Sequence, residues 1–177
     1  SLPFHQEFCV NVVDSDYSAV SYLGGVAPQP NLVTVARLPG NRTVYRQAES
    51  PAQGTSRPRG HPTWFGAPMS LKAPDTWDAP DEVATTTLTT RKGQTYTVQL
   101  EGWYDLLRRG TRDLPMHQYP FTLVRARVMD DQGELVFTRP LWLVVVGQRR
   151  RELSLRDIWD AYRQRYDLEH FFRFGKQ

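Results

Sequence analysis

The last segment of the chain, residues 153–177, holds four polar residues whose spacing brings them to one face of an α-helix. These residues are Tyr162, Arg165, Glu169 and Lys176. Each helical residue turns by about 100°, so the three later side chains project within about 60° of the first. Leu155, Ile158 and Trp159 occupy nearly the same arc one to two turns earlier. The helix is therefore expected to face inward and to change along that face from an apolar stripe to a polar site.

The limits of this helix are also marked in the sequence. Ser154 is placed to act as its N-cap, with Asp157 three residues later in a weaker form of the capping box. Gly175 is placed to end it. The alternative interpretation is an amphipathic helix whose charged residues form ion pairs along a solvated face.

Positive charge is concentrated in the same segment. Residues 149–177 hold eight Arg and Lys residues against five Asp and Glu, whereas residues 1–148 hold fourteen of each. All of the net charge of +3 thus lies in the terminal segment, which suits a polyanion such as DNA. Three consecutive arginines, Arg149 to Arg151, also fit a solvated loop, and charge alone does not decide between the two.

The rest of the composition limits the class of protein. A chain of 177 residues can bury one core, or one core with an inserted subdomain. It has no run of about 18 apolar residues and no secretory leader. The single cysteine, Cys9, indicates a reducing, cytoplasmic setting. The four histidines lack the spacing of a zinc site. Because the chain begins with Ser1 and stops one residue after Lys176, we expect a fragment of a longer protein.

The N-terminal part places a carboxylate after a buried strand. Phe8–Val13 is a short β-branched and aromatic run, and Asp14 follows it directly, where α/β folds place functional groups. Asp14 also suits a plain turn at the end of a strand. Asp16 is expected to cap a short helix from Tyr17 to Leu23, which Gly24 and Gly25 would close. A second buried strand is expected at 32–37.

The middle of the chain, from residue 39 to 148, predicts a β-rich unit with almost no helical period. Trp64 and Trp77 are expected to anchor a long excursion rich in Pro and Gly over residues 47–82. The segment 106–119 is basic and turn-like, with Arg108, Arg109 and Arg112 close together. Strands are expected at 43–46, 83–90, 94–104, 121–129, 133–138 and 141–146, the middle four as two hairpins.

This order of elements predicts an α/β fold whose core is interrupted by a β-rich insertion. We expect core residues at 1–38, the insertion at 39–148, and core again at 149–177. The insertion would separate two carboxylates, Asp14 and Glu169, which would have to meet in space to form one site.

At this point the residues resemble a known family. The pattern Tyr162-x2-Arg165-x3-Glu169-x6-Lys176 is similar to the Tyr-Arg-Glu-Lys signature of bacterial insertion-sequence DDE transposases. The stretch Val12 to Tyr17 also resembles the box that carries the second Asp of this class. The resemblance implies an incomplete ribonuclease H-like core interrupted by a β-rich insertion subdomain.

The resemblance also implies roles for individual residues. Asp14 and Glu169 would be the second and third acids of the catalytic triad and would ligate Mg²⁺ or Mn²⁺. Two such ions would activate the attacking hydroxyl and stabilise the leaving 3′-oxygen. The residues expected to contact DNA are Tyr162, Arg165, Lys176, Trp142 and Tyr166. For Trp142, which would stack on a flipped base, a place in the core of the sheet is the equal alternative.

One feature of the family is missing. Residues 1–13 contain no aspartate, so the first acid of the triad has no counterpart, and we expect this chain to be inactive alone. The implied partners are the transposon ends and target DNA, with a homodimer in the full-length protein and a cytoplasmic, nucleoid-associated location in a bacterium. The alternatives are a ribonuclease H-like nuclease that cuts without joining, and a β-rich DNA-binding module without catalysis.

Overall fold

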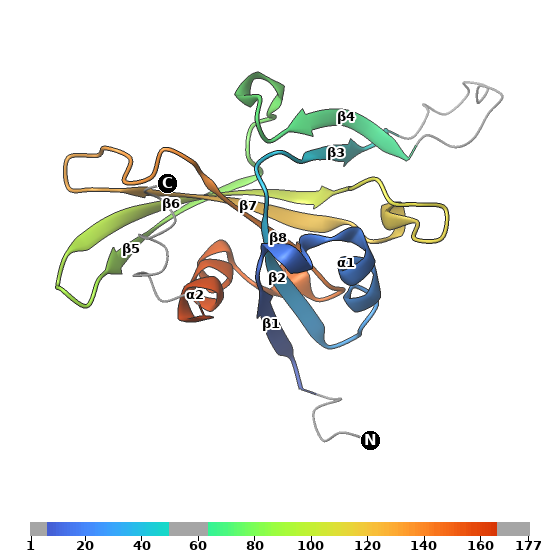
Figure 1. The fold of residues 1–177 in the computed structure, drawn as a ribbon, viewed down its shortest axis with the longest axis horizontal. Coiled ribbons are helices and arrows are strands. Elements are labelled where there is room, and N and C mark those ends of the chain that lie inside the picture. Colours follow the sequence, from blue (N-terminus) through green and yellow to red (C-terminus); the bar gives the residue numbers. More distant parts are fainter. Residues whose placement is uncertain (1–6, 50–63, 166–177) are drawn as a thin grey trace.

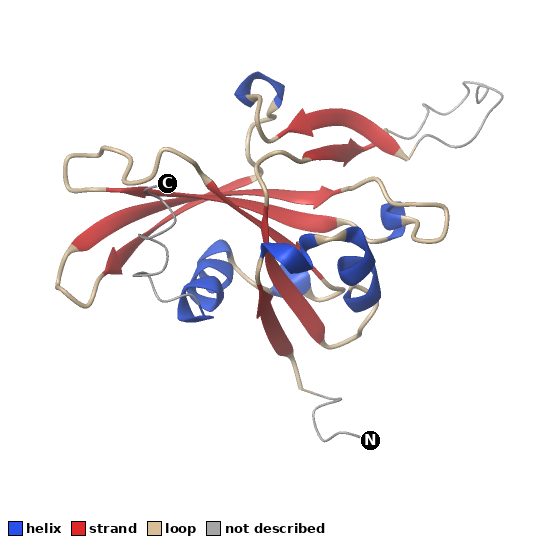
Figure 2. Cartoon of the chain, in the orientation of Figure 1, coloured by secondary structure: helices blue, strands red, loops and turns tan. Residues whose placement is uncertain are grey.

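The computed structural model describes residues 7–49 and 64–165 of the chain. Strands dominate this part, and the helices are short (Figure 2). The elements in chain order are β1 (Cys9–Val13), η1 (Ser15–Ser18), α1 (Val20–Val26), β2 (Leu32–Leu38), β3 (Thr43–Gln47), β4 (Phe65–Ser70), η2 (Pro74–Thr76), β5 (Glu82–Thr89), β6 (Thr95–Leu106), η3 (Met116–Gln118), β7 (Phe121–Met129), β8 (Leu141–Val146), η4 (Arg150–Glu152) and α2 (Leu155–Arg165), where η marks a 3₁₀-helix. Within the described ranges, no helix is both long enough and apolar enough to span a bilayer.

Six strands form one mixed sheet in the order β1-β2-β8-β7-β6-β5 (Figure 1). β1 and β2 are parallel, and the other neighbouring pairs are antiparallel. The twist between neighbours accumulates across the sheet, so that β1 and β2 run across the direction of β5 and β6 in Figure 1. β3 and β4 form a separate two-stranded ribbon. Because β2 pairs with β8, strands from the two parts expected as core and insertion share one sheet.

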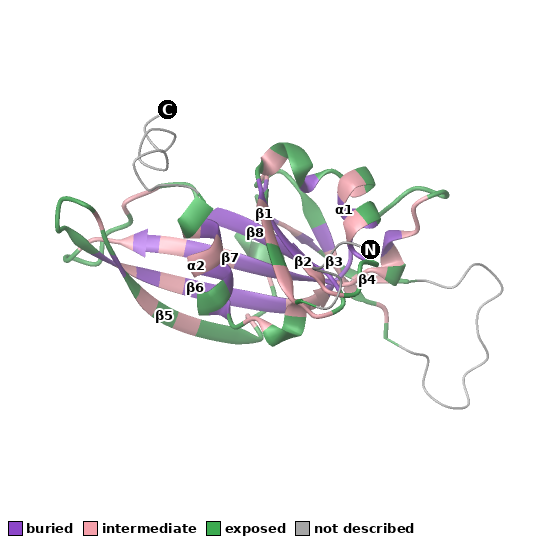
Figure 3. Cartoon of the chain, turned by 90° about the horizontal axis from the view of Figure 1, so that it is seen from below, coloured by how far each residue is buried: buried purple, intermediate pink, exposed green. Residues whose placement is uncertain are grey.

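Both faces of the sheet are covered, and β8 lies at its centre. All six residues of β8 are buried, as its continuous apolar run predicts. On one face, Trp142 and its alternate neighbours pack with α1 and the β3–β4 ribbon. On the other face, Leu143 and its alternate neighbours pack with α2. Figure 3 shows α2 lying over the buried stretches of β6 and β7.

Several expected elements are confirmed. The strands at 9–13, 32–38, 43–47 and 141–146 occur where the apolar runs predicted them. β5 and β6 form the expected hairpin, and Gly93 takes a positive φ of 79° in its turn, a conformation that suits glycine. Ser154 and Asp157 form the expected capping box, because the carboxylate of Asp157 accepts from the N–H and hydroxyl of Ser154, whose Oγ accepts from the N–H of Asp157.

Three local predictions are wrong. The helix expected at 17–23 is divided into η1 and α1, and α1 continues through Gly24 and Gly25. Asp16 does not cap α1, whose N-cap is Ala19 without a side-chain bond. The strand expected at 133–138 is reduced to one bridge between Met129 and Leu135.

The physical reason for the first difference is packing. A Cβ on Gly24 would come 3.2 Å from Met116 Sδ and 3.3 Å from a methyl group of Leu114. Glycine at this position therefore allows the 110–119 segment to approach the helix closely. Gly24 is required by this tertiary contact and does not end the helix.

Candidate active site

Asp14 lies at the C-terminal end of β1, at the point where the strand passes into η1. Its backbone is extended, and its Oδ1 accepts a hydrogen bond of 2.6 Å from the N–H of Ser15. The side chain is exposed. Val13, the last residue of β1 and the one before Asp14, pairs with Ala36 of the parallel strand β2. The carboxyl ends of two parallel strands thus present a carboxylate to solvent, which is a common position for functional groups in α/β folds.

The helix α2 packs its apolar face against the sheet, as the sequence predicts. Leu155, Ile158, Trp159 and Tyr162 are each no more than 4% exposed and belong to one core cluster. α2 contacts β1 and β2 as well as β5 and β6. The helix therefore lies beside the strand that ends at Asp14, although the two segments are at opposite ends of the sequence.

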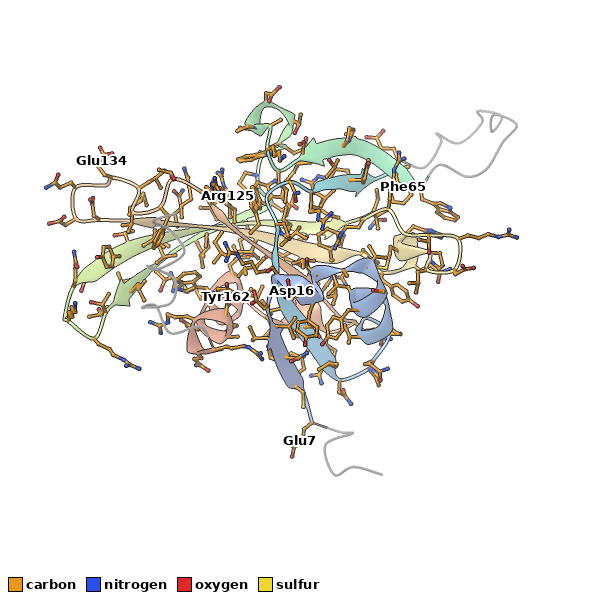
Figure 4. The ribbon with its side chains drawn as sticks, in the orientation of Figure 1. Glu7, Asp16, Phe65, Arg125, Glu134 and Tyr162 are labelled. Carbon is orange, nitrogen blue, oxygen red and sulfur yellow. The ribbon has the colours of Figure 1, made fainter. Side chains whose placement is uncertain are left out.

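Figure 4 gives the positions of residues on these two elements. Tyr162 lies on α2. Asp16 lies on η1, the 3₁₀-helix that begins directly after Asp14. Tyr162 is 4% exposed, so the described structure places it in the core with the apolar stripe. Arg165, one turn later on the helix, is exposed. The inward face of the helix thus remains buried as far as Tyr162.

The remaining members of the expected polar face lie outside the described residues. These are Tyr166, Glu169 and Lys176. Their proximity to Asp14 stays a prediction.

Trp142 lies in β8 and is 2% exposed. Its ring centroid is 5.1 Å from that of Trp77 and 5.8 Å from that of Trp103. In this arrangement the indole packs in the core of the sheet, and stacking on a base would require it to leave that core. The expected anchoring role of Trp77 is consistent with its edge-on contact to Trp142.

Sequence reasoning did not identify the residues that hold the turn after Asp14. Arg108 is buried, and its Nη1 donates a hydrogen bond of 2.6 Å to the carbonyl oxygen of Ser18, the last residue of η1. Asn11 of β1 donates to the hydroxyl of Tyr22 on α1 at 3.0 Å. The cluster of arginines in the 106–119 segment was the available signal, but a basic, turn-like segment usually predicts solvent exposure.

The described part of the chain offers few ligands for a metal ion. It contains no group of three or more His, Cys, Asp or Glu side chains that could hold an ion. It does contain the exposed carboxylate of Asp14, and oxygen ligands of this kind suit Mg²⁺, which binds through one or two carboxylates and keeps several waters. Asp14 therefore fits a role as one ligand of a site that needs further carboxylates.

Comparison with known proteins gives the class. The family model described as DDE superfamily endonuclease matches residues 4–109, which is more than half of the chain. The chain belongs to this family of nucleases, and the matched segment includes β1, Asp14 and the turn held by Arg108. No curated protein and no solved structure gives a significant match.

Proposed function

We propose that the chain is part of the catalytic domain of a metal-dependent DDE transposase that cuts DNA and joins strands at the ends of an insertion sequence. The observation that carries this proposal is the packing of α2 against β1 and β2, beside the strand that ends at Asp14. Glu169 follows Arg165 in the sequence at the signature spacing and lies outside the described residues. Membership of the DDE endonucleases supports the same chemistry.

In this proposal the fold is an incomplete ribonuclease H-like core with a β-rich insertion between its parts. Asp14 and Glu169 together hold Mg²⁺ or Mn²⁺, and Arg165 and Lys176 bind phosphates near the scissile end. When bound, the metal supplies Lewis-acid stabilisation of the reacting oxygens. Tyr162, Tyr166 and Trp142 are candidates for contacts to the DNA strand. For Tyr162 and Trp142 this requires movement out of the buried positions described above.

Two acids are fewer than the three that the family uses, and no aspartate precedes Asp14. The isolated 177-residue chain is therefore expected to bind a divalent ion weakly and not to cleave DNA. The complete cytoplasmic enzyme is expected to act as a dimer on two transposon ends. Strong Mg²⁺-dependent cleavage by the isolated chain would contradict this part of the proposal.

The metal site can be tested with Mn²⁺ as the probe. Paramagnetic broadening of amide signals by Mn²⁺ is expected around Asp14 in the wild-type chain. It should be lost in both Asp14→Asn and Glu169→Gln, because each removes one of the two carboxylates. Asp131→Asn, in an exposed turn, removes the same charge and serves as the matched control.

The outcomes separate the competing functions. Loss of broadening with Asp14→Asn but not with Glu169→Gln would contradict a site shared by the two residues. Salt-sensitive DNA binding without any Mn²⁺ broadening in the wild type would instead favour the non-catalytic DNA-binding module. Strand joining, assayed in the full-length protein, distinguishes a transposase from a nuclease that only cuts.

A further inference from the structure

The most buried arginine of the described residues is Arg108, two residues after the end of β6 at Leu106. It is 8% exposed, and within the described residues its guanidinium donates one hydrogen bond, to the carbonyl oxygen of Ser18. A carbonyl oxygen carries no net charge. The positive charge of Arg108 is therefore buried without a compensating negative charge in the described structure.

Other arginines that are partly buried differ from Arg108 in this respect. Each is within ion-pair distance of a carboxylate: Arg46 with Asp78 and Asp81, Arg125 and Arg127 with Glu101, Arg149 with Glu152, Arg150 with Asp105, and Arg163 with Asp160. Among the described residues, the partly buried arginines thus have a counter-charge, and the buried Arg108, next to the turn after Asp14, does not.

The charge of Arg42 acts on Arg108 with the same sign. Burial lowers the pKa of the Arg108 guanidinium, and the charge of Arg42 lowers it further. A bridge between Tyr45 and Leu107 brings the two segments side by side, since Tyr45 N–H donates to Leu107 O at 2.9 Å and Leu107 N–H donates to Tyr45 O at 2.7 Å. Arg42 itself is exposed.

Burial of an unpaired charge near a like charge destabilises a folded protein. Such an arrangement is relieved when an anion binds, and a guanidinium matches the geometry of phosphate with paired donors. Arg108 is joined to the turn after β1 through the carbonyl oxygen of Ser18, and Arg42 is exposed. A phosphate group on a long polymer can approach this pair of arginines from the solvent side, where Arg42 is exposed, without entering the core.

We propose that Arg108 and Arg42 form a binding site for a backbone phosphate of DNA, next to the turn that follows Asp14. We call this pair the Arg108 site. The inference rests on the proposed function in its choice of DNA, because that function requires a DNA strand at Asp14. Phosphate contacts fix the register of a strand without reading its sequence, so the Arg108 site would position the strand relative to the carboxylate.

The first test uses inorganic phosphate as the probe, in the presence of a chelator and at constant ionic strength. Phosphate is expected to raise the melting temperature of the wild-type chain relative to chloride. The increase should be lost in Arg108→Met and Arg42→Met and kept in Lys92→Met, which removes a charge from the turn at the far end of the β5–β6 hairpin. An equal increase in all four proteins would reflect general salt stabilisation and would overturn the site.

The same variants distinguish a binding role from a structural one. Without phosphate, Arg108→Met is expected to melt close to the wild-type temperature, because the removal of a buried charge offsets the loss of the hydrogen bond to Ser18. A drop of several degrees with an unchanged phosphate response would make Arg108 a structural residue and contradict the proposal. If Arg108→Met does not fold, Arg42→Met decides, because Arg42 is exposed.

The second test uses a short DNA duplex of mixed sequence, again without metal. Arg108→Met and Arg42→Met are each expected to weaken binding by about tenfold and to reduce the slope of log K against log salt by about one. Lys92→Met should change neither. Unchanged affinity and slope in both arginine variants would overturn the proposal.

Because these assays contain no metal, Asp14→Asn and Glu169→Gln should retain the phosphate response. A failure of the Mn²⁺ experiment would therefore leave the Arg108 site standing, and a failure here would leave the metal site standing.

Discussion

The ring of Trp77 meets the ring of Trp142 edge to face, with centroids 5.1 Å apart and planes at 84°. Trp77 also donates its indole N–H to the carbonyl oxygen of Ser70 at 2.7 Å. The segment after β4 is thereby fixed to the centre of the sheet, and Trp142 is closed off from solvent. Two roles assigned to Trp142, base stacking and core packing, can be separated because they predict different stabilities.

Trp142→Ala is expected to lower the free energy of unfolding by about 3–5 kcal/mol, since it removes a large side chain from a buried site. Urea denaturation followed by circular dichroism measures this loss. Trp64→Ala is the matched control, because Trp64 is 49% exposed. A loss for Trp142→Ala as small as that of the control would show that the indole is not a core residue in solution, and would favour the stacking role.

Glu101 holds two arginines of the neighbouring strand. It is 8% exposed, and its two carboxylate oxygens form ion pairs with Arg125 and Arg127. These arginines line a hollow of about 240 Å³ between β7 and the loop before β8. Glu101→Gln leaves both guanidinium charges without their partner, and we expect unfolding to become easier by about 3 kcal/mol.

The measurement for Glu101 is a double-mutant cycle with Arg125→Met. The double variant is expected to be less destabilised than the sum of the two single variants, because it removes a charge from each side of the pair. Additive losses would indicate that the ion pair contributes little. Arg108→Met is the comparison variant: in the described structure Arg108 pairs with no carboxylate, so its replacement leaves no carboxylate unpaired.

Tyr104 is expected to titrate late. Burial and, after it, the hydrogen bond to the Glu82 carboxylate raise the pKa of Tyr104 from 10.0 to about 12. The guanidinium of Arg151, 3.5 Å from the ring centroid, acts in the opposite direction. Because the pKa in the folded state exceeds the unfolded value, the contribution of Tyr104 to stability is complete below pH 10 and falls as the pH rises towards about 12.

The ultraviolet absorbance of phenolate tests this expectation. The difference between the titrations of wild type and Tyr104→Phe should be a single transition near pH 12. Glu82→Gln removes the carboxylate that disfavours phenolate formation, so this transition should move to lower pH. A transition that stays in place in Glu82→Gln would exclude Glu82 as a cause.

The strands and the inward face of the last helix could be predicted from sequence because their signals are local. Six consecutive apolar residues from Leu141 to Val146 can be satisfied only where both faces are buried, and the stripe from Leu155 to Trp159 has one helical period. The capping box at Ser154 is equally local, since its two members are three residues apart.

The features that sequence reasoning missed depend on distant neighbours. Gly24 and Gly25 suggest the end of a helix until the position of Met116 is known. Arg108 has the same local pattern as the exposed Arg109, and only the fold places it against Ser18. The pairing of β2 with β8 joins residues more than a hundred positions apart, and no periodicity encodes that partner.

The docking of α2 depends on a glycine in β6. A Cβ on Gly102 would come 2.7 Å from Leu155 Cδ2, which is closer than such atoms approach in proteins. Leu155 is 1% exposed, so its methyl group has little room to move. Gly102→Ala is expected to displace the start of α2 and to cost about 1–3 kcal/mol of stability.

A second substitution identifies the cause of this loss. Leu155→Ala opens the space that the new methyl group needs, so Gly102→Ala combined with Leu155→Ala should be less destabilised than the sum of the single variants. If Asp14 and Glu169 share a metal, Gly102→Ala should also weaken Mn²⁺ binding, because Glu169 follows α2 by four residues in the sequence. Urea denaturation and Mn²⁺ titration of the three variants measure both effects. Weakened Mn²⁺ binding that the double variant partly restores would link the packing of Leu155 on Gly102 to the geometry of the site. Additive stability losses would show instead that the two positions act independently.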